Sequence, residues 1–526
     1  MARPSLLLAL VLSTLGCSTG APDIILLGKV WTGDPERPWG QAVAIRGDSI
    51  VQVGDSLEIL ALAGQGTELV RVGSGLIVPG FQDNHTHFVQ GGFQLAGVDL
   101  RDADTPEEFT RRIAEHARTL APGEWILGGD WDHEQWPAAP LPRRDWIDSV
   151  TPDNPVFVSR LDGHMALANS AALAAAGITA ATEEVAGGTI VRGPGGSPAG
   201  VLKDGAMGLV SRVIPEPSAA QLDTALTRGM AHAASLGVTG VTFVSATWPE
   251  VAALRRAEAA GTLTLRTSAY PWFSDWRTVA DSLPVLAVGS RWLRVAGVKG
   301  MVDGSLGSTT AWFYQPYLDE PGTAGFTVTP VDSVAAWVGA ADSAGLQVIV
   351  HAIGDRANDV LLAIFDSVAQ AHGPRDRRFR IEHAQHLSRA GVARFAALGV
   401  IPSMQPYHAI DDGRWAAKRI GPERTKTTYA FRSLLDAGAR LTFGSDWTVA
   451  PLDPLLGIDA AVSRRTIDGR NPGGWVPEER ITVEEALRAY TVANAYGVFG
   501  EGWTGTLKPG YQADLVVIDR DITTLP

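Results

Sequence analysis

Only one cysteine, Cys17, occurs among the 526 residues of the sequence. A single thiol excludes an internal disulfide framework, a cysteine-based zinc site, an iron–sulfur cluster and a Cys-x-x-Cys redox motif. The sequence also has no run of Lys and Arg long enough to follow a phosphate backbone, and its 57 acidic residues outnumber its 44 basic residues. We therefore expect no nucleic-acid partner.

Low-complexity segments and internal repeats are also absent, which argues against a disordered chain, a propeller or a solenoid. Hydrophobic residues make up 45% of the sequence and charged residues 19%, which is typical of a folded globular protein. A chain of this length can bury a large core, and it accommodates either several domains or one barrel with additions.

The first 16 residues have the layout of an export signal. Arg3 precedes an apolar run over residues 6–12, which is too short to span a bilayer, and small residues stand before Cys17. We expect residues 1–16 to be removed when the protein is exported.

Cys17 and its neighbours resemble the lipobox of bacterial lipoproteins, although Thr14 stands where leucine is usual. The resemblance implies lipidation of Cys17, with residues 17–22 as a tether to a membrane surface that faces the periplasm or the cell exterior. Release as a secreted soluble protein is the alternative.

The two ends of the chain predict one small β domain. Short apolar segments separated by glycine turns fill residues 23–78, and a turn followed by an apolar strand recurs at residues 505–518. We expect residues 23–78 and 500–526 to form a small β-sandwich domain.

Between residues 79 and 499, apolar β-branched runs alternate with Ala- and Leu-rich stretches of helical period. The predicted strands are Ile77–His85, Val238–Ser245, Leu263–Tyr270, Leu293–Gly300, Leu346–His351, Phe379–His383, Val400–Gln405 and Leu441–Asp446. Eight such alternations favour a closed (β/α)₈ TIM barrel over an open sheet. Residues 95–200 form too long a connection for one barrel unit, so we expect an inserted subdomain after the first barrel strand.

The first barrel strand ends in His85-Thr86-His87. On an extended segment residues i and i+2 point to the same side, so both imidazoles can reach one metal ion. Four further residues with metal-binding or basic side chains end other predicted strands: Lys299, His351, His383 and Asp446. The carboxyl ends of barrel strands converge on one face, so these six side chains can meet.

The pattern resembles the amidohydrolase superfamily of metal-dependent hydrolases, and more closely its YtcJ-like branch (amidohydrolase family 3). The segments that carry the resemblance are Pro79–His87, Val298–Ser308, His351–Arg356, Ile381–Gln385, Gly444–Trp447, Asp162–His164 and Leu507–Val516. The resemblance covers nearly the whole chain after the export signal.

This resemblance implies a binuclear site for divalent metal ions, commonly zinc. His85, His87 and Asp446 would hold the more buried ion, and His351 and His383 the more exposed one. Lys299 would bridge the two ions. A protonated lysine carries only donors, so the bridge requires that carbon dioxide converts the Lys299 amine into a carbamate; with a free amine, the site would be mononuclear.

The expected chemistry is hydrolysis of a non-peptide C–N bond, an amide or cyclic amide of a small-molecule substrate. A metal-activated hydroxide would attack the carbonyl carbon, with Asp446 as general base. Two alternatives stay open: the same metal site acting on an ester, lactone or phosphoester, and an exported lipoprotein that binds its ligand without turnover.

Four other residues are predicted to contact the substrate. Gln405 and Trp447 stand just past strand ends, Asp303 follows the Lys299 strand, and His164 lies in the insertion. Tryptophans near His164 predict either an aromatic lid or simply the core of the inserted subdomain.

The sequence stops at Pro526, where similar chains usually continue into a further strand. We expect either a truncated copy or a β domain that lacks one strand. An unpaired edge strand invites self-association, which would give a homodimer.

Overall fold

The computed structural model describes residues 20–185, 188–286, 290–295 and 297–524. The chain divides into two compact units. The first comprises the described part of Met1–Val78 with Leu507–Ala513 and Val517–Asp521, and the second comprises Pro79–Thr506, Asp514–Val516 and Ile522–Pro526 as far as described. The predicted export signal and the lipidation site Cys17 lie outside the described residues.

The first unit is built on one five-stranded sheet of order β20-β4-β1-β2-β3. Its elements are β1 (Ile24–Trp31), β2 (Trp39–Arg46), β3 (Ser49–Gly54), helix α1 (Ser56–Leu60), β4 (Glu68–Pro79) and β20 (Leu515–Ile518). The expectation of a β-sandwich is wrong for the described residues, because no second sheet packs on this one. Ile59 of α1 joins the apolar cluster of Ile25 and Ala44, so a helix covers that face.

The C-terminal contribution to this unit is also shorter than predicted, since it begins at Leu507 instead of residue 500.

The second unit contains two parallel sheets, of order β14-β13-β12-β5 and β15-β16-β17-β18-β19. The strands are β5 (Phe81–Thr86), β12 (Val238–Val244), β13 (Arg266–Tyr270), β14 (Leu293–Val295), β15 (Gly297–Met301), β16 (Gln347–Ala352), β17 (Arg380–His383), β18 (Ile401–Met404) and β19 (Thr442–Phe443). Each of the eight predicted strands overlaps one of these or the pair β14 and β15. Isolated parallel bridges join Trp272 to Lys299 and Thr86 to Trp447, one at each seam between the sheets.

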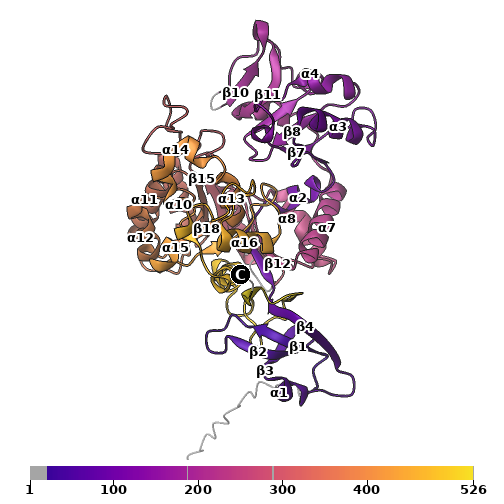
Figure 1. Cartoon of the computed structure of the whole chain (residues 1–526), viewed down its shortest axis with the longest axis vertical. Helices are drawn as coiled ribbons and strands as arrows, with labels where there is room; N and C mark the ends of the chain where they lie inside the picture. The colour runs from indigo at the N-terminus through magenta and orange to yellow at the C-terminus, as the bar shows by residue number, and fades with distance from the viewer. Residues whose placement is uncertain (1–19, 186–187, 287–289, 296, 525–526) are drawn as a thin grey trace, which may run out of the picture. The chain divides into compact units, whose positions relative to one another are not determined.

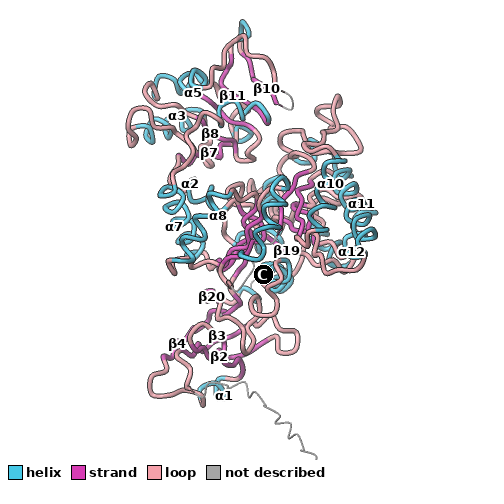
Figure 2. Tube along the Cα trace, turned by 180° about the vertical axis from the view of Figure 1, so that it is seen from behind, coloured by secondary structure: helices cyan, strands magenta, loops and turns pink. Residues whose placement is uncertain are grey.

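Helices flank the parallel strands on both sides, as expected for alternating strands and helices (Figures 1 and 2). They are α2 (Phe88–Gln94), α7 (Ala219–Ser235), α8 (Trp248–Ala259), α9 (Trp276–Leu286), α10 (Val331–Ser343), α11 (Asp355–His372), α12 (Arg389–Leu398), α13 (Pro406–Asp412), α14 (Ala416–Thr425), α15 (Phe431–Asp436), α16 (Pro454–Ser463), α17 (Val483–Tyr490) and α18 (Val492–Gly497). Helix α7 shows why these boundaries were predictable: Ser218 and Gln221 form a reciprocal capping box at its start.

The long connection after β5 carries a six-stranded sheet of its own, of order β10-β11-β9-β8-β7-β6. Its elements are β6 (Val98–Asp99), α3 (Pro106–Ala117), β7 (Gly128–Trp131), α4 (Arg144–Ile147), β8 (Phe157–Arg160), β9 (Met165–Ala168), α5 (Ser170–Ala175), β10 (Gly188–Arg192), β11 (Pro198–Asp204) and α6 (Gly208–Ser211). Trp131 and Trp136 are buried in the apolar core of this segment, where each ring packs edge-to-face on Phe109. These two tryptophans are core residues and form no lid.

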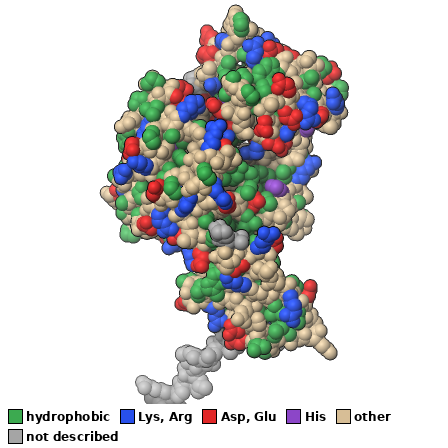
Figure 3. All heavy atoms as spheres, in the orientation of Figure 1, with side chains coloured by type: hydrophobic (Ala, Val, Ile, Leu, Met, Phe, Trp, Pro, Cys, Tyr) green, Lys and Arg blue, Asp and Glu red, His purple; other side chains and the backbone are tan. Residues whose placement is uncertain are grey.

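Basic and acidic side chains are interspersed over the face of the molecule drawn in Figure 3. Within the described ranges no helix combines the length and the apolar character needed to cross a membrane.

Candidate metal centre

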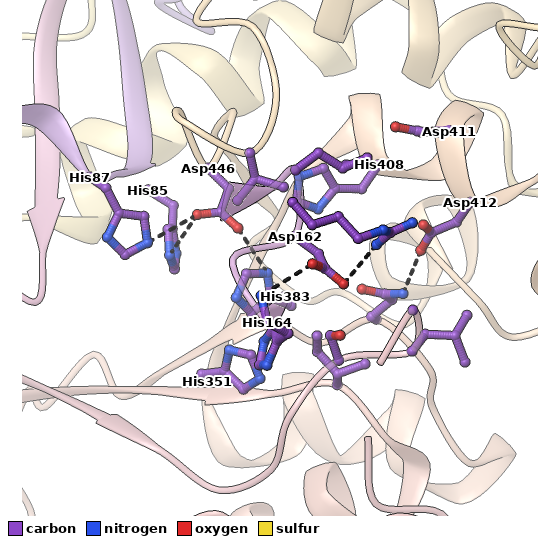
Figure 4. Close-up of a pocket in the computed structure, with 18 of the residues that line it drawn as sticks. His85, His87, Asp162, His164, His351, His383, His408, Asp411, Asp412 and Asp446 are labelled. Carbon is purple, nitrogen blue, oxygen red and sulfur yellow. Dashed lines mark hydrogen bonds and ion pairs between the residues drawn. The ribbon is translucent and has the colours of Figure 1, made fainter. Parts of the chain in front are cut away.

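All six predicted metal ligands line one cavity of about 450 Å³ in the second unit (Figure 4). His85 lies near the end of β5, Lys299 in β15, His351 in β16 and His383 at the end of β17. Asp446 lies in the loop after β19. Parallel strands bring these residues together because their carboxyl ends meet on the same face.

The first group of donors consists of His85, His87 and Asp446. The Nε2 atoms of both histidines lie 3.4 Å from Oδ1 of Asp446. This oxygen is buried and has no hydrogen-bond partner, which is costly for a carboxylate unless a cation binds there. Two backbone bonds hold the group in place, from Asp446 N–H to the His85 carbonyl oxygen (2.8 Å) and from His87 N–H to the Trp447 carbonyl oxygen (2.6 Å).

The Nδ1 atom of His85 is already committed, because it lies 2.5 Å from Oε2 of the fully buried Glu382. Its Nε2 atom is therefore the one left for a metal ion. Burial, helped by the charge of Lys299, lowers the pKa of His85 to about 4. The ring is neutral near pH 7, which is the form that ligates a metal.

Neighbouring side chains stabilise the ionised form of the Glu382 carboxyl group. Burial raises its pKa, but Arg380 and His85 outweigh burial and bring the pKa to about 2. The carboxylate accepts hydrogen bonds from Nε of Arg380 and from the hydroxyl of Ser403, both at 2.9 Å.

His351 and His383 form a second pair of donors, with ring centroids 4.5 Å apart. The Nε2 atom of His351 donates to the Gly304 carbonyl oxygen at 3.1 Å, and Nδ1 of His383 donates to Oε1 of Gln405 at 2.8 Å. Each ring therefore keeps one uncommitted nitrogen, Nδ1 in His351 and Nε2 in His383. Burial lowers the pKa of both rings, to about 3 for His351.

Lys299 lies among these donors, with its Nζ atom 3.4 Å from Nε2 of His85. Its side chain is buried, and burial lowers its pKa to about 8. The unprotonated amine is therefore a much larger fraction of Lys299 near pH 7 than of an exposed lysine.

His408, in the first turn of α13, belongs to the same cluster, although the sequence did not point to it. Its ring lies parallel to that of His383, at 13° and 6.4 Å between centroids, and its buried Nε2 atom has no hydrogen-bond partner. Donor atoms of His383, His408 and Asp446 all lie within 4.8 Å of one another. The signal in the sequence was its position three residues after Gln405, which follows a barrel strand.

Of the four predicted substrate contacts, only His164 lines the cavity. Gln405 is fully buried and positions His383. Trp447 is buried and packs edge-to-face on Phe88 at 5.7 Å.

Asp303 likewise lies behind the cavity wall. Its fully buried carboxylate accepts hydrogen bonds from the backbone N–H groups of Trp312 (2.7 Å), Ile353 (2.9 Å) and Gly354 (2.8 Å). The prediction that Gln405, Trp447 and Asp303 contact substrate is therefore corrected: each supports the loops or rings around the cavity.

The inserted segment contributes a cluster of paired charged side chains to the cavity wall, which the sequence did not predict. The buried Arg160 guanidinium lies 2.7 Å from an oxygen of Asp132 and 2.8 Å from one of Asp162. The Ser308 hydroxyl, from the loop after β15, donates to Asp162 at 3.1 Å. This contact joins the inserted segment to a loop far away in the sequence.

Comparisons with known proteins identify the family of the chain. The model of the amidohydrolase family matches residues 74–526. The chain is 40% identical over 510 residues to the protein LONG AFTER FAR-RED 3 of Arabidopsis thaliana, covering 95% of this chain and 87% of that protein. It is 30% identical over 464 residues to YtcJ of Bacillus subtilis, covering 86% of each. It is 28% identical over 515 residues to the N-substituted formamide deformylase of Arthrobacter pascens, covering 95% and 93%.

Two solved structures of uncharacterized metal-dependent hydrolases are similar along the whole length. The one from Pyrococcus furiosus has 30% identity and a TM-score of 0.75, over 95% of this chain and 100% of that chain. The one from Pyrococcus horikoshii has 29% identity and a TM-score of 0.78, over 95% and 98%. Fold and site together define an α/β metal-dependent hydrolase. The chain belongs to the amidohydrolase family, and the resemblance to its YtcJ-like branch is confirmed.

Proposed function

We propose that this enzyme hydrolyses the C–N bond of an uncharged amide or cyclic amide, using two divalent metal ions. The observation that carries the proposal is the buried Oδ1 of Asp446, which has no hydrogen-bond partner and lies 3.4 Å from the Nε2 atoms of His85 and His87. A carboxylate oxygen and neutral imidazoles are the donors that zinc prefers in catalytic sites.

The residues that would hold the ions follow from their uncommitted atoms. His85, His87 and Asp446 would bind the first ion, and His351 and His383 the second. Lys299 would bridge them as a carbamate, which forms when the neutral amine bonds to the carbon of carbon dioxide and releases a proton. The lowered pKa of Lys299 favours this step.

When bound, such ions supply a nucleophile from water at neutral pH and polarise the carbonyl group. The protein supplies the rest. Asp446 accepts the proton of the attacking water, Glu382 and Gln405 orient the ligand rings, and Leu306 and Ile353 in the cavity wall limit access of bulk water.

The charges in the cavity wall favour an uncharged substrate. Arg160 forms ion pairs with Asp132 and Asp162, and Arg414 forms one with Asp411. Each of these charged side chains therefore already has a partner of opposite charge and does not require one on the ligand. The relative from Arthrobacter pascens is an N-substituted formamide deformylase, which suggests N-substituted formamides as the first compounds to test.

The experiment compares turnover of N-substituted formamides, anilides, lactones and phosphoesters by enzyme loaded with zinc. We expect C–N cleavage that disappears on chelation and returns with zinc. Faster turnover of lactones or phosphoesters would favour the alternative substrates. Tight binding of a formamide without turnover, by protein that carries no metal, would favour the receptor alternative.

We further propose that the two parallel sheets form one closed eight-stranded barrel, with residues 95–200 as an inserted subdomain. The parallel bridges at both seams support closure. Strand β14 and strand β15 then count as one barrel strand.

For localisation we propose export and lipid anchoring through Cys17, with a membrane surface and a small molecule as the partners. Cys17→Ser should move the protein from the membrane fraction to the soluble fraction. An unchanged distribution would contradict the anchor. Sedimentation of the purified protein tests whether it forms a homodimer.

A further inference from the structure

His164 reaches the metal-centre cavity from the inserted segment, in the loop between β8 and β9, and a carboxylate lies behind it. Its Nδ1 atom lies 2.8 Å from Oδ1 of Asp204, at the end of β11. Because a carboxylate only accepts, Nδ1 carries the proton and Nε2 is the ring atom left for the cavity. Figure 4 shows His164 in the same cavity as His351 and His383.

The position of this ring is fixed by several contacts. The Asp204 N–H donates to the His164 carbonyl oxygen at 3.0 Å, so one residue holds both the backbone and the side chain of His164. The His164 N–H donates to Oδ1 of Asp162 at 3.1 Å. Asp162 is in turn tied to Arg160 and to Ser308 of the barrel loop, as described above.

Asp204 adopts a backbone conformation that L-residues rarely use, with φ 46° and ψ −124°. Strained backbone of this kind persists only where the surrounding structure enforces it, and it is concentrated at functional sites. The contacts around Asp204 therefore fix its carboxylate next to Nδ1 of His164.

The pKa of His164 is also shifted by its neighbours. Burial lowers the pKa of His164, but the hydrogen bond to Asp204 and the charge of Asp162 outweigh burial and leave the pKa raised. The positive charge of Arg160 acts in the opposite direction and lowers the pKa of His164. The charge of His164 is among the causes that lower the pKa of His351.

We propose that His164, oriented by Asp204, is the acid that protonates the leaving nitrogen. The inference rests on the proposed C–N hydrolysis. The water oxygen bonds to the carbonyl carbon while one water proton passes to Asp446. The C–N bond then breaks, its electron pair stays on nitrogen, and the nitrogen takes the proton from Nε2 of His164. Exchange with solvent removes the proton from Asp446 and returns one to His164.

This assignment separates two roles that one carboxylate would otherwise fill in succession. Asp446 comes from the loop after β19 and lies among the metal donors, whereas His164 comes from the inserted segment. An acid and a base on different elements can act on the departing nitrogen and the attacking water in the same turnover.

The test uses a series of formanilides and N-alkylformamides whose leaving amines differ in basicity. An alkylamine must be protonated to leave, whereas 4-nitroaniline depends on protonation much less. We expect His164→Gln to lower kcat by about 10²- to 10³-fold for N-alkylformamides and by less than about 10-fold for the nitroanilide. Asp204→Asn should give a smaller loss of the same pattern.

Metal content and Tm are measured for each variant and should match the wild type. His116→Gln is the control, because His116 lies in α3 of the same insertion and does not line the cavity. Equal losses across the series, or loss of metal in His164→Gln, would overturn the acid role. Failure of the wild type to hydrolyse any amide would overturn the proposed function and this inference with it.

Discussion

Glu382→Gln removes a buried charge that contacts His85, one of the proposed metal ligands. The carboxylate accepts from Nδ1 of His85 at 2.5 Å and from Nε of Arg380 at 2.9 Å, and its side chain is fully buried. Glutamine keeps the shape and one acceptor oxygen. It places an NH₂ group where the second oxygen was, so either His85 or Arg380 loses its acceptor.

The size of the effect follows from these contacts. Removing one partner of a buried ion pair costs about 3–5 kcal/mol. Arg380 keeps other acceptors, since it donates to Oδ1 of Asn84 at 2.7 Å and to the Asn84 carbonyl oxygen at 2.6 Å. We therefore expect about 3 kcal/mol of lost stability, near the lower end of that range. Loss of the partner that orients a ligand histidine should weaken metal binding by about 10- to 100-fold.

The assay is titration of the metal-free protein with zinc, together with denaturant unfolding. The matched control is Glu479→Gln, a buried carboxylate in the same unit that binds the Ser433 backbone N–H at 3.0 Å and lies outside the cavity lining. We expect the control to lose stability with an unchanged zinc Kd. The reasoning would be refuted if both variants kept wild-type zinc affinity.

Three further predictions concern the same unit. Asp446→Asn should retain much of the metal while kcat falls by at least about 10³-fold, measured by metal analysis and turnover; full activity would refute the assigned base. Lys299→Ala should lose about one ion per chain, and added short-chain carboxylates should restore part of the activity; unchanged metal content would exclude a bridge. Burial raises the pKa of Asp412 from 3.8 to about 7, so wild-type stability should fall as pH rises from 4 to 7. Asp412→Asn should reduce that decline by up to about 4 kcal/mol, in unfolding measured at pH 4 and pH 8.

The strand ends of the barrel region were predictable because their signal is local. Apolar β-branched runs mark buried parallel strands, and His351 and His383 each stand at or next to the end of one. The common direction of the strands then predicts that these side chains meet. Asp446 follows its short strand by three residues and still reaches the group, because its N–H bonds to the His85 carbonyl oxygen.

Other features depended on contacts between distant segments, which periodicity does not encode. His408 approaches His383 from a helix instead of a strand end, so its role appeared only when α13 was placed. Arg160 lines the cavity because the insertion packs against Ser308. The first unit was predicted as a sandwich from short apolar segments separated by glycine turns. Such segments do not tell whether a second sheet or a helix such as α1 covers the buried face of the sheet.

The proposed C–N hydrolysis requires two metal ions bound in the same cavity. The most direct measurement loads metal-free enzyme with increasing zinc and records bound metal and N-substituted formamide hydrolysis in the same samples. Activity should rise with zinc and saturate at two ions per chain, and His85→Ala combined with His87→Ala should remove at least one ion per chain and abolish turnover. Full hydrolysis by metal-free protein, or zinc binding unaffected by that double variant, would contradict this requirement.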